Sequence, residues 1–159
     1  MGKLNQVIFF ILIMYCLLIS AGTALSACTV STTPMGFGNY DSFSTNPLDT
    51  AGTITVNCTL DVVKVNLTAG PSQTSGIFNP RQMKRSGGTD LLNYNIFTDV
   101  ARTIIFGNNT GGTAGIQLRR PHGRPAPWNQ MITIYGRIPP GQDILVGGYS
   151  DSLTITIDW

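Results

Sequence analysis

Hydrophobic and polar residues alternate along most of the chain that follows residue 28. In the run 53–60 (TITVNCTL), apolar residues occupy every second position, with Thr and Asn between them. Similar alternation occurs at 63–67, 92–96 and 132–134, and the runs are separated by turns rich in Gly, Asn, Pro and Ser. Period-two runs separated in this way are typical of antiparallel strands. The pattern predicts an all-β chain, folded as an antiparallel β-sandwich.

The last alternating run closes the chain at 153–159 (LTITIDW). Its apolar residues share one face of an extended chain, and Thr and Asp share the other. We therefore expect a final strand whose apolar face lies on the core. The residues on that face are Leu153, Ile155, Ile157 and Trp159.

Residues 1–26 follow a different pattern. Lys3 precedes an uncharged apolar run at 7–19, and small and polar residues (AGTALSA) follow it. This order predicts a secretory signal peptide that is cut after Ser26, leaving 27–159 as one mature domain. The apolar run is shorter than the roughly 20 residues that a membrane-spanning helix needs, so we expect no integral membrane span after cleavage.

Two cysteines remain once Cys16 is removed with the signal. In an exported chain a remaining pair favours a disulfide, here between Cys28 and Cys58. Cys58 lies on the apolar face of its run, where a disulfide is well placed. The alternative is lipid on Cys28, because 25–28 (LSAC) also resembles a bacterial lipoprotein cleavage site.

The amino-acid composition argues against several classes of protein. Only 11% of residues are charged, there is no Glu, and the chain holds 18 Gly and 9 Pro. Such a chain has few of the residues that favour solvent-exposed helices. Its net charge of only +2 argues against a nucleic-acid partner, which usually requires a strongly basic face.

No arrangement of side chains predicts catalysis. His122 is the single histidine and lies in a proline-rich loop, and there is no Glu to pair with a nucleophile. Asp99 and Arg102 fit a turn or a structural ion pair better than an active site. We expect no enzyme activity, no metal site and no cofactor.

Eight short motifs, in order along the chain, resemble those of the spore coat protein U domain family. The resemblance covers essentially the whole mature chain. The motifs are 28–30 (CTV), 37–41 (FGNYD), 52–58 (GTITVNC), 81–83 (RQM), 92–99 (LNYNIFTD), 101–103 (ART), 135–138 (YGRI) and 148–157 (GYSDSLTITI).

The resemblance implies a structural subunit of a secreted fibre, the archaic chaperone–usher pilus, or of a surface coat, with a role in adhesion or biofilm formation. Its fold would be an immunoglobulin-like sandwich that lacks one strand and is completed by donor-strand addition. The implied partners are a periplasmic chaperone, an outer-membrane usher and other subunits. The implied route is export through the periplasm to the cell surface or fimbrium, or secretion. The final run, Leu153, Ile155, Ile157 and Trp159, would be the strand that the chaperone grips.

One feature departs from a polymerising subunit, which needs a donor segment of about 10–15 residues before its first core cysteine. With cleavage after Ser26, no such segment precedes Cys28. We therefore expect a tip-like or minor subunit, or a coat protein, in preference to a repeating shaft subunit.

Two other classes of function remain open. One is a self-contained secreted module that binds carbohydrate through Trp128, Tyr135 and the basic cluster. The other is a lipid-anchored envelope protein. The cluster is otherwise expected to be a solvated loop, or to recognise an acidic glycan or partner; its members are Arg119, Arg120 and Arg124.

Overall fold

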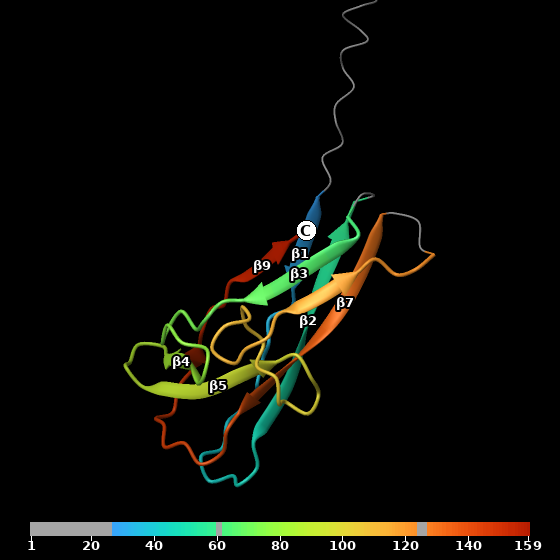
Figure 1. The fold of residues 1–159 in the computed structure, drawn as a ribbon. Coiled ribbons are helices and arrows are strands. Elements are labelled where there is room, and N and C mark those ends of the chain that lie inside the picture. The colour runs from blue at the N-terminus through green and yellow to red at the C-terminus, as the bar shows by residue number, and fades with distance from the viewer. Residues whose placement is uncertain (1–26, 60–61, 124–126) are drawn as a thin grey trace, which may run out of the picture.

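The structure of the protein is a computed structural model that describes residues 27–59, 62–123 and 127–159. These residues form nine strands and no helix, which confirms the all-β prediction (Figure 1). The strands are β1 (Cys28–Thr32), β2 (Leu48–Cys58), β3 (Lys64–Ala69), β4 (Arg81–Arg85), β5 (Leu91–Phe97), β6 (Ile116–Arg119), β7 (Trp128–Ile138), β8 (Tyr149–Ser150) and β9 (Ile155–Asp158).

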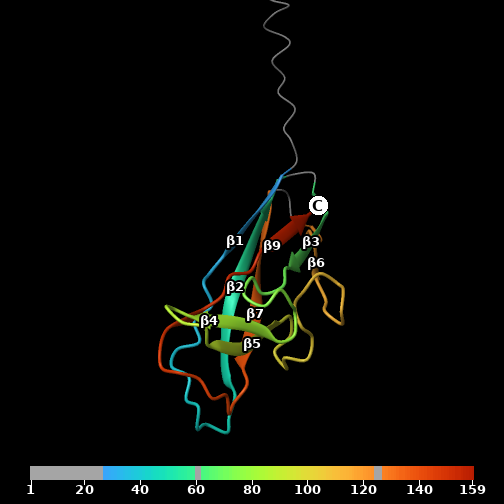
Figure 2. The ribbon, with the colours of Figure 1, turned by 90° about the vertical axis from the view of Figure 1, so that its left-hand side faces the viewer.

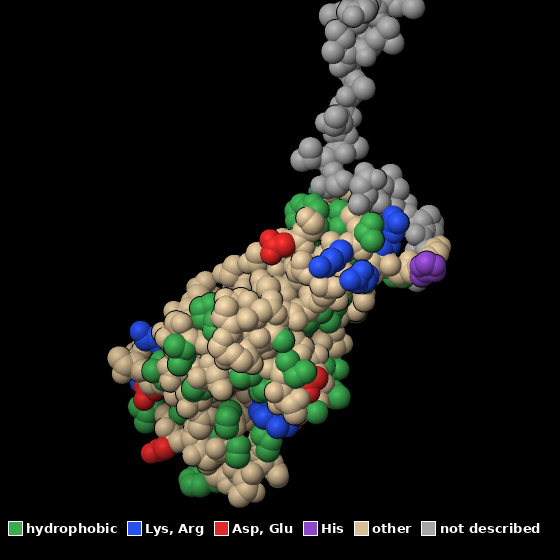
Figure 3. All heavy atoms as spheres, viewed as in Figure 1, with side chains coloured by type: hydrophobic (Ala, Val, Ile, Leu, Met, Phe, Trp, Pro, Cys, Tyr) green, Lys and Arg blue, Asp and Glu red, His purple; other side chains and the backbone are tan. Residues whose placement is uncertain are grey.

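The strands form two sheets, with the orders β1-β2-β7-β5-β4-β8 and β6-β3-β9. Every pair of neighbouring strands is antiparallel. The three-stranded sheet lies beside the upper part of β2 and β7, whereas β4 and β5 cross their lower part (Figures 1 and 2). The fold is therefore an antiparallel sandwich of immunoglobulin-like type. Charged side chains are sparse on the face shown in Figure 3.

The centre of the larger sheet is the pair β2–β7. The two strands pair over all 11 residues of each, from Leu48 opposite Ile138 to Cys58 opposite Trp128. Alternate side chains point inward, as the period-two pattern predicts, so Val56 is completely buried. This face forms most of one wall of the core.

Two strands at neighbouring edges have one partner each. β1 pairs only with β2, and β9 pairs only with β3, where Ile157 lies opposite Leu67 and Ile155 opposite Ala69. The two edges lie close together in both views of the ribbon (Figures 1 and 2). Among the described residues, no strand pairs with the outer edge of either one.

A buried arginine joins the two layers away from these edges. Arg81 is fully buried; its Nη1 donates to Oδ1 of Asn95 at 2.7 Å, and its Nη2 donates to the carbonyl oxygens of Gly70 at 2.8 Å and Phe106 at 2.7 Å. Burial lowers the pKa of the guanidinium. Because Gly70 directly follows β3, these bonds tie β4 and β5 to the smaller sheet.

Candidate functional site: an apolar groove at the β1–β9 edge

A cavity of about 850 Å³ opens between the segment that follows β1 and the segment that leads into β9. It extends from exposed residues such as Val146 to buried core residues such as Ile54 and Phe106. Its apolar walls come from both sheets and from the two segments. Lining side chains include Met35, Phe37, Met83, Leu92, Ile96, Ile134, Ile138, Leu153 and Ile155.

The segment 33–40 covers the inner face of β2 and β7 without being a strand. It fits closely because Gly136 has no side chain: a Cβ there would lie 2.5 Å from Sδ of Met35 and 2.8 Å from Cζ of Phe37. The Phe37 ring meets Tyr94 edge-on, with ring centroids 6.0 Å apart. Irregular chain therefore covers this part of the core, and the groove remains open beside it.

The groove is lined at its C-terminal side by Leu153, which precedes β9, and by Ile155 at the start of that strand. Leu153, Ile155 and Ile157 are half-buried and pack against the core, whereas Thr156 is exposed. Trp159 differs from the expectation, since it is 56% exposed and is not part of the core. The reason is that pairing with β3 ends at Asp158, so no ladder holds the last residue inward.

One wall of the cavity carries a hydrogen-bonded polar cluster. The hydroxyl of Tyr94 donates to Oδ2 of Asp151 at 2.7 Å, and Thr74 donates to Oδ1 through its amide at 3.2 Å and its hydroxyl at 3.1 Å. Burial, and then the bond to Asp151, raise the pKa of Tyr94 far above its usual range. Tyr94 therefore stays a protonated donor that anchors the approach to β9, and the cavity suits apolar side chains.

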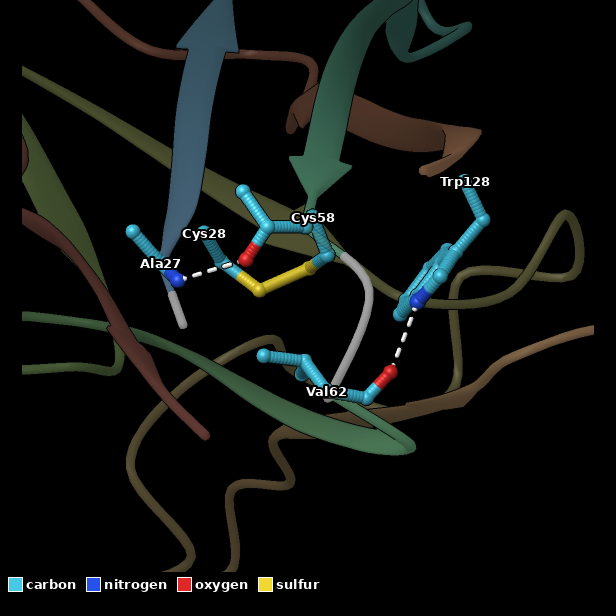
Figure 4. Close-up of a disulfide and its surroundings, with 6 residues drawn as sticks. Ala27, Cys28, Cys58, Val62 and Trp128 are labelled. Carbon is cyan, nitrogen blue, oxygen red and sulfur yellow. Dashed lines mark hydrogen bonds between the residues drawn. A yellow bond between two sulfur atoms is a disulfide. The ribbon is translucent and has the colours of Figure 1, made fainter. Parts of the chain in front are cut away.

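The predicted disulfide is present between Cys28 and Cys58, which lie directly opposite each other in β1 and β2 (Figure 4). The amide of Ala27 donates to Oγ1 of Thr59 at 2.8 Å and extends the pairing by one step. Lipid on Cys28 would need the sulfur that is bonded to Cys58. On the chain-entropy estimate this bridge stabilises the fold by about 3–4 kcal/mol.

Trp128 and Tyr135, the two aromatic residues of the alternative carbohydrate site, are not brought together. Trp128 is 3% exposed, and its Nε1 donates to the carbonyl oxygen of Val62 at 2.8 Å (Figure 4). Tyr135 lies an odd number of residues away on the unbroken strand β7, so it faces the opposite side, where Arg102 lies 5.7 Å from its ring. Arg119 is exposed on β6, and Arg124 lies outside the described residues.

Asp99 closes a turn, as expected. It accepts hydrogen bonds from the amides of Thr103 and Ile104, and the bond from Ile104 contributes most to lowering the pKa of this carboxyl. The ion pair of Arg102 is formed with Asp49, at 3.3 Å, rather than with Asp99.

His122 is exposed. In the part of the chain that the structure describes, no cluster of three or more His, Cys, Asp or Glu side chains could hold a metal ion. The same residues contain no helix long and apolar enough to cross a membrane. The expected signal segment, 1–26, lies outside them.

The sequence pattern missed the residues that shape the groove from the N-terminal side. The segment 33–40 lacks alternation, so Met35 and Phe37 carried no strand signal. A usable signal existed in Gly52 and Gly136, which occupy inward positions on the mostly apolar faces of β2 and β7 and so indicate close approach by another segment.

Solved structures with this arrangement define the class of fold. The chain matches a chain of the CsuC–CsuE chaperone–tip adhesion subunit pre-assembly complex from the archaic chaperone–usher Csu pili of Acinetobacter baumannii, with a TM-score of 0.61 and 16% identity. The match covers 85% of this chain and only 40% of that one. The P pilus rod subunit PapA matches with a TM-score of 0.50 and 13% identity, over 82% of this chain and 97% of PapA. The fold is thus of the pilin type.

Sequence comparison identifies the family. Residues 14–156 match the model of the Spore Coat Protein U domain. Protein U of Myxococcus xanthus is 33% identical over an alignment of 133 residues, and the match covers 77% of this chain and 70% of that protein. The chain belongs to the spore coat protein U domain family, as the sequence motifs predicted.

Proposed function

We propose that this chain is a structural subunit of a secreted surface fibre or coat, and that its groove accepts a β-strand from a partner. The observation that carries the proposal is the cavity between the segment that follows the edge strand β1 and the segment that leads into the edge strand β9. On this proposal the sandwich of 27–159 lacks one strand, and the missing strand belongs to another protein.

Strand addition accounts for both features of the groove. Free backbone groups along an edge can hydrogen-bond to an incoming strand, while its alternate side chains enter apolar pockets. Here the edge is β9, and the half-buried Ile155 and Ile157 would become fully buried. Each Å² of apolar surface removed from water contributes about 25 cal/mol, so a filled groove stabilises the subunit considerably.

An open edge of this kind also promotes aggregation, because any exposed strand can pair with it. We propose that a periplasmic chaperone fills the groove during export, that an outer-membrane usher passes the subunit outward, and that a strand of another subunit replaces the chaperone. The similarity to a subunit from a chaperone–tip subunit complex supports this order of partners.

The first test is co-expression of the exported chain with the chaperone encoded beside its gene. We expect little soluble subunit alone and a one-to-one complex with the chaperone. Ile155→Asp places a charge on the groove face and should abolish the complex, whereas Thr156→Asp, on the exposed face of the same strand, should retain it.

Circular dichroism and retention of the Cys28–Cys58 disulfide show whether the Ile155→Asp variant is still folded. A wild-type chain that is a stable monomer alone, or a folded Ile155→Asp variant that still forms the complex, would show that the sandwich is closed and that the proposal is wrong.

Signal cleavage after Ser26 and a role in adhesion or biofilm formation complete the proposal. Intact mass of the exported chain should correspond to residues 27–159 less two hydrogens for the disulfide. Loss of the gene should reduce attachment of cells to a surface, and unchanged attachment would count against the adhesive role.

A further inference from the structure

Two cations lie directly opposite each other on the outer face of the smaller sheet. Lys64 at the start of β3 pairs in register with Arg119 at the end of β6, and both side chains are exposed. Like charges at directly opposed positions destabilise a pair of strands. The fold therefore keeps a repulsive contact where neutral residues would be more stable.

No carboxylate within the described part of the chain forms an ion pair with Lys64 or Arg119. The ion pairs found there are Arg85–Asp90, Arg102–Asp49 and Arg137–Asp49, all away from β3 and β6. Asp158 of β9 is on the same face, directly opposite Asn66 and diagonal to Lys64, and it forms no ion pair with Lys64 or Arg119. Lys and Arg side chains and the single His gather at this end of the molecule (Figure 3).

Amide side chains continue the face next to the cations. Asn66 lies opposite Gln117, whose Nε2 donates to Oδ1 of Asn66 at 3.3 Å, and Nη2 of Arg119 donates to Oε1 of Gln117 at 3.2 Å. Thr68 of β3 and Thr156 of β9 follow on the same side. The outward positions of these three strands carry no aromatic residue.

We propose that this surface, the basic–amide face (Lys64, Asn66, Gln117 and Arg119), binds an acidic polysaccharide. The two cations would hold the carboxylate or sulfate groups of such a polymer, and their mutual repulsion would fall when an anion lies between them. The amides offer donors and acceptors for sugar hydroxyls. A nucleic acid fits less well, because the face lacks the aromatic residues on which single-stranded bases stack.

The basic–amide face is independent of the groove. Its side chains point away from the core, whereas the groove opens into it, so a subunit with a filled groove would still present this face. The inference therefore holds for a fibre subunit, a coat protein or a free domain.

The test measures binding of the exported chain, with its chaperone if it requires one, to alginate as the acidic polymer and to dextran as the neutral control. We expect binding to alginate alone, weakening as salt rises. Lys64→Gln and Arg119→Gln should each weaken binding by roughly fivefold, and together by more than tenfold. Lys84→Gln removes an equally exposed lysine on β4 and should change binding by less than about twofold.

Thermal unfolding separates binding from folding. Lys64→Gln should leave the unfolding temperature unchanged or raise it, because a repulsion is removed. An equal loss of binding in Lys84→Gln, or absence of binding to alginate, would overturn the proposal. Equally tight binding to single-stranded DNA, lost in the same variants, would overturn the assignment to a polysaccharide.

Discussion

The strands β2 and β9 have the same alternating pattern but very different surroundings. β2 is paired on both edges, with β1 and β7, and its inward residues Ile54 and Val56 are 4% and 0% exposed. β9 is paired on one edge, and its inward residues Ile155 and Ile157 are only half-buried. Alternation therefore shows which face of a strand is apolar, but the neighbouring elements decide whether that face is covered.

The two strands also differ in how much they contribute to the stability of the isolated chain. The covered face of β2 already contributes its full hydrophobic free energy in the isolated chain. The face of β9 is only half-buried, so covering it with a partner strand would add further hydrophobic stabilisation. In this molecule one kind of sequence pattern forms fully buried core in one strand and a half-buried face in another.

The largest expected effect comes from breaking the closed side of the core. Arg81→Met removes three hydrogen bonds and leaves Gly70 and Phe106 with buried, unpaired carbonyl oxygens. We expect a loss of about 3–5 kcal/mol in the free energy of unfolding. Urea denaturation measures it, with Lys84→Met on the exposed side of the same strand as the control. Equal stability of the two variants would contradict a structural role for the buried guanidinium.

A matched pair of truncations sharpens the comparison directly. Val56→Ala, at a completely buried position that does not line the groove, should lower the free energy of unfolding by about 2 kcal/mol, and by the same amount in the free chain and in the chaperone complex. Ile155→Ala should cost about 1–2 kcal/mol in the free chain, because its side chain is only half-buried, and more in the complex. Denaturation of both forms gives the four values. If Ile155→Ala costs no more in the complex than in the free chain, β9 is not the strand that the partner covers.

The smallest expected effect is on the stability of the fold at low pH. A hydrogen bond from Arg137, together with the charges of Arg137 and Arg102, holds the pKa of Asp49 below its ordinary value. Its contribution to stability is present above the unfolded pKa of about 3.9 and is lost as pH falls through the lower folded value. Because the pair is partly exposed, we expect less than about 1 kcal/mol. Asp49→Asn should therefore reduce the loss of stability between neutral pH and pH ~3.

The control for this measurement is Asp143→Asn, which removes an exposed acid in a loop. It should leave the pH dependence of unfolding as it is in the wild type. An Asp49→Asn variant with the same acid sensitivity as the wild type would show that the pair with Arg137 contributes nothing measurable.

The sequence predicted the strands in which apolar residues are buried and polar residues are exposed. It identified β2, β3, β5, β7 and β9 from alternation, and the disulfide from the cysteine count. It did not identify β4, because one of its two buried positions holds the cation Arg81 rather than an apolar residue.

The candidate site was only partly predictable for a related reason. Alternation placed Leu153, Ile155 and Ile157 on the side that faces the core, and the first two line the groove. It could not reveal that Trp159 lies beyond the last paired residue. The opposite wall depends on long-range packing of Met35 and Phe37 over Gly136. Local patterns do not encode which distant segment fills the space above a glycine.

The disulfide has a mechanical consequence for a chain that is pulled from its N-terminal end. Cys28 and Cys58 are 30 residues apart in sequence but face each other across β1 and β2. A force applied at Ala27 passes through the two sulfur atoms directly into the end of β2, so the chain between the cysteines carries no tension. In a single-molecule pulling experiment, the oxidised domain therefore lengthens less on unfolding than the reduced one. The shortfall equals the extended length of that loop, roughly 3.3–3.6 Å for each of its residues.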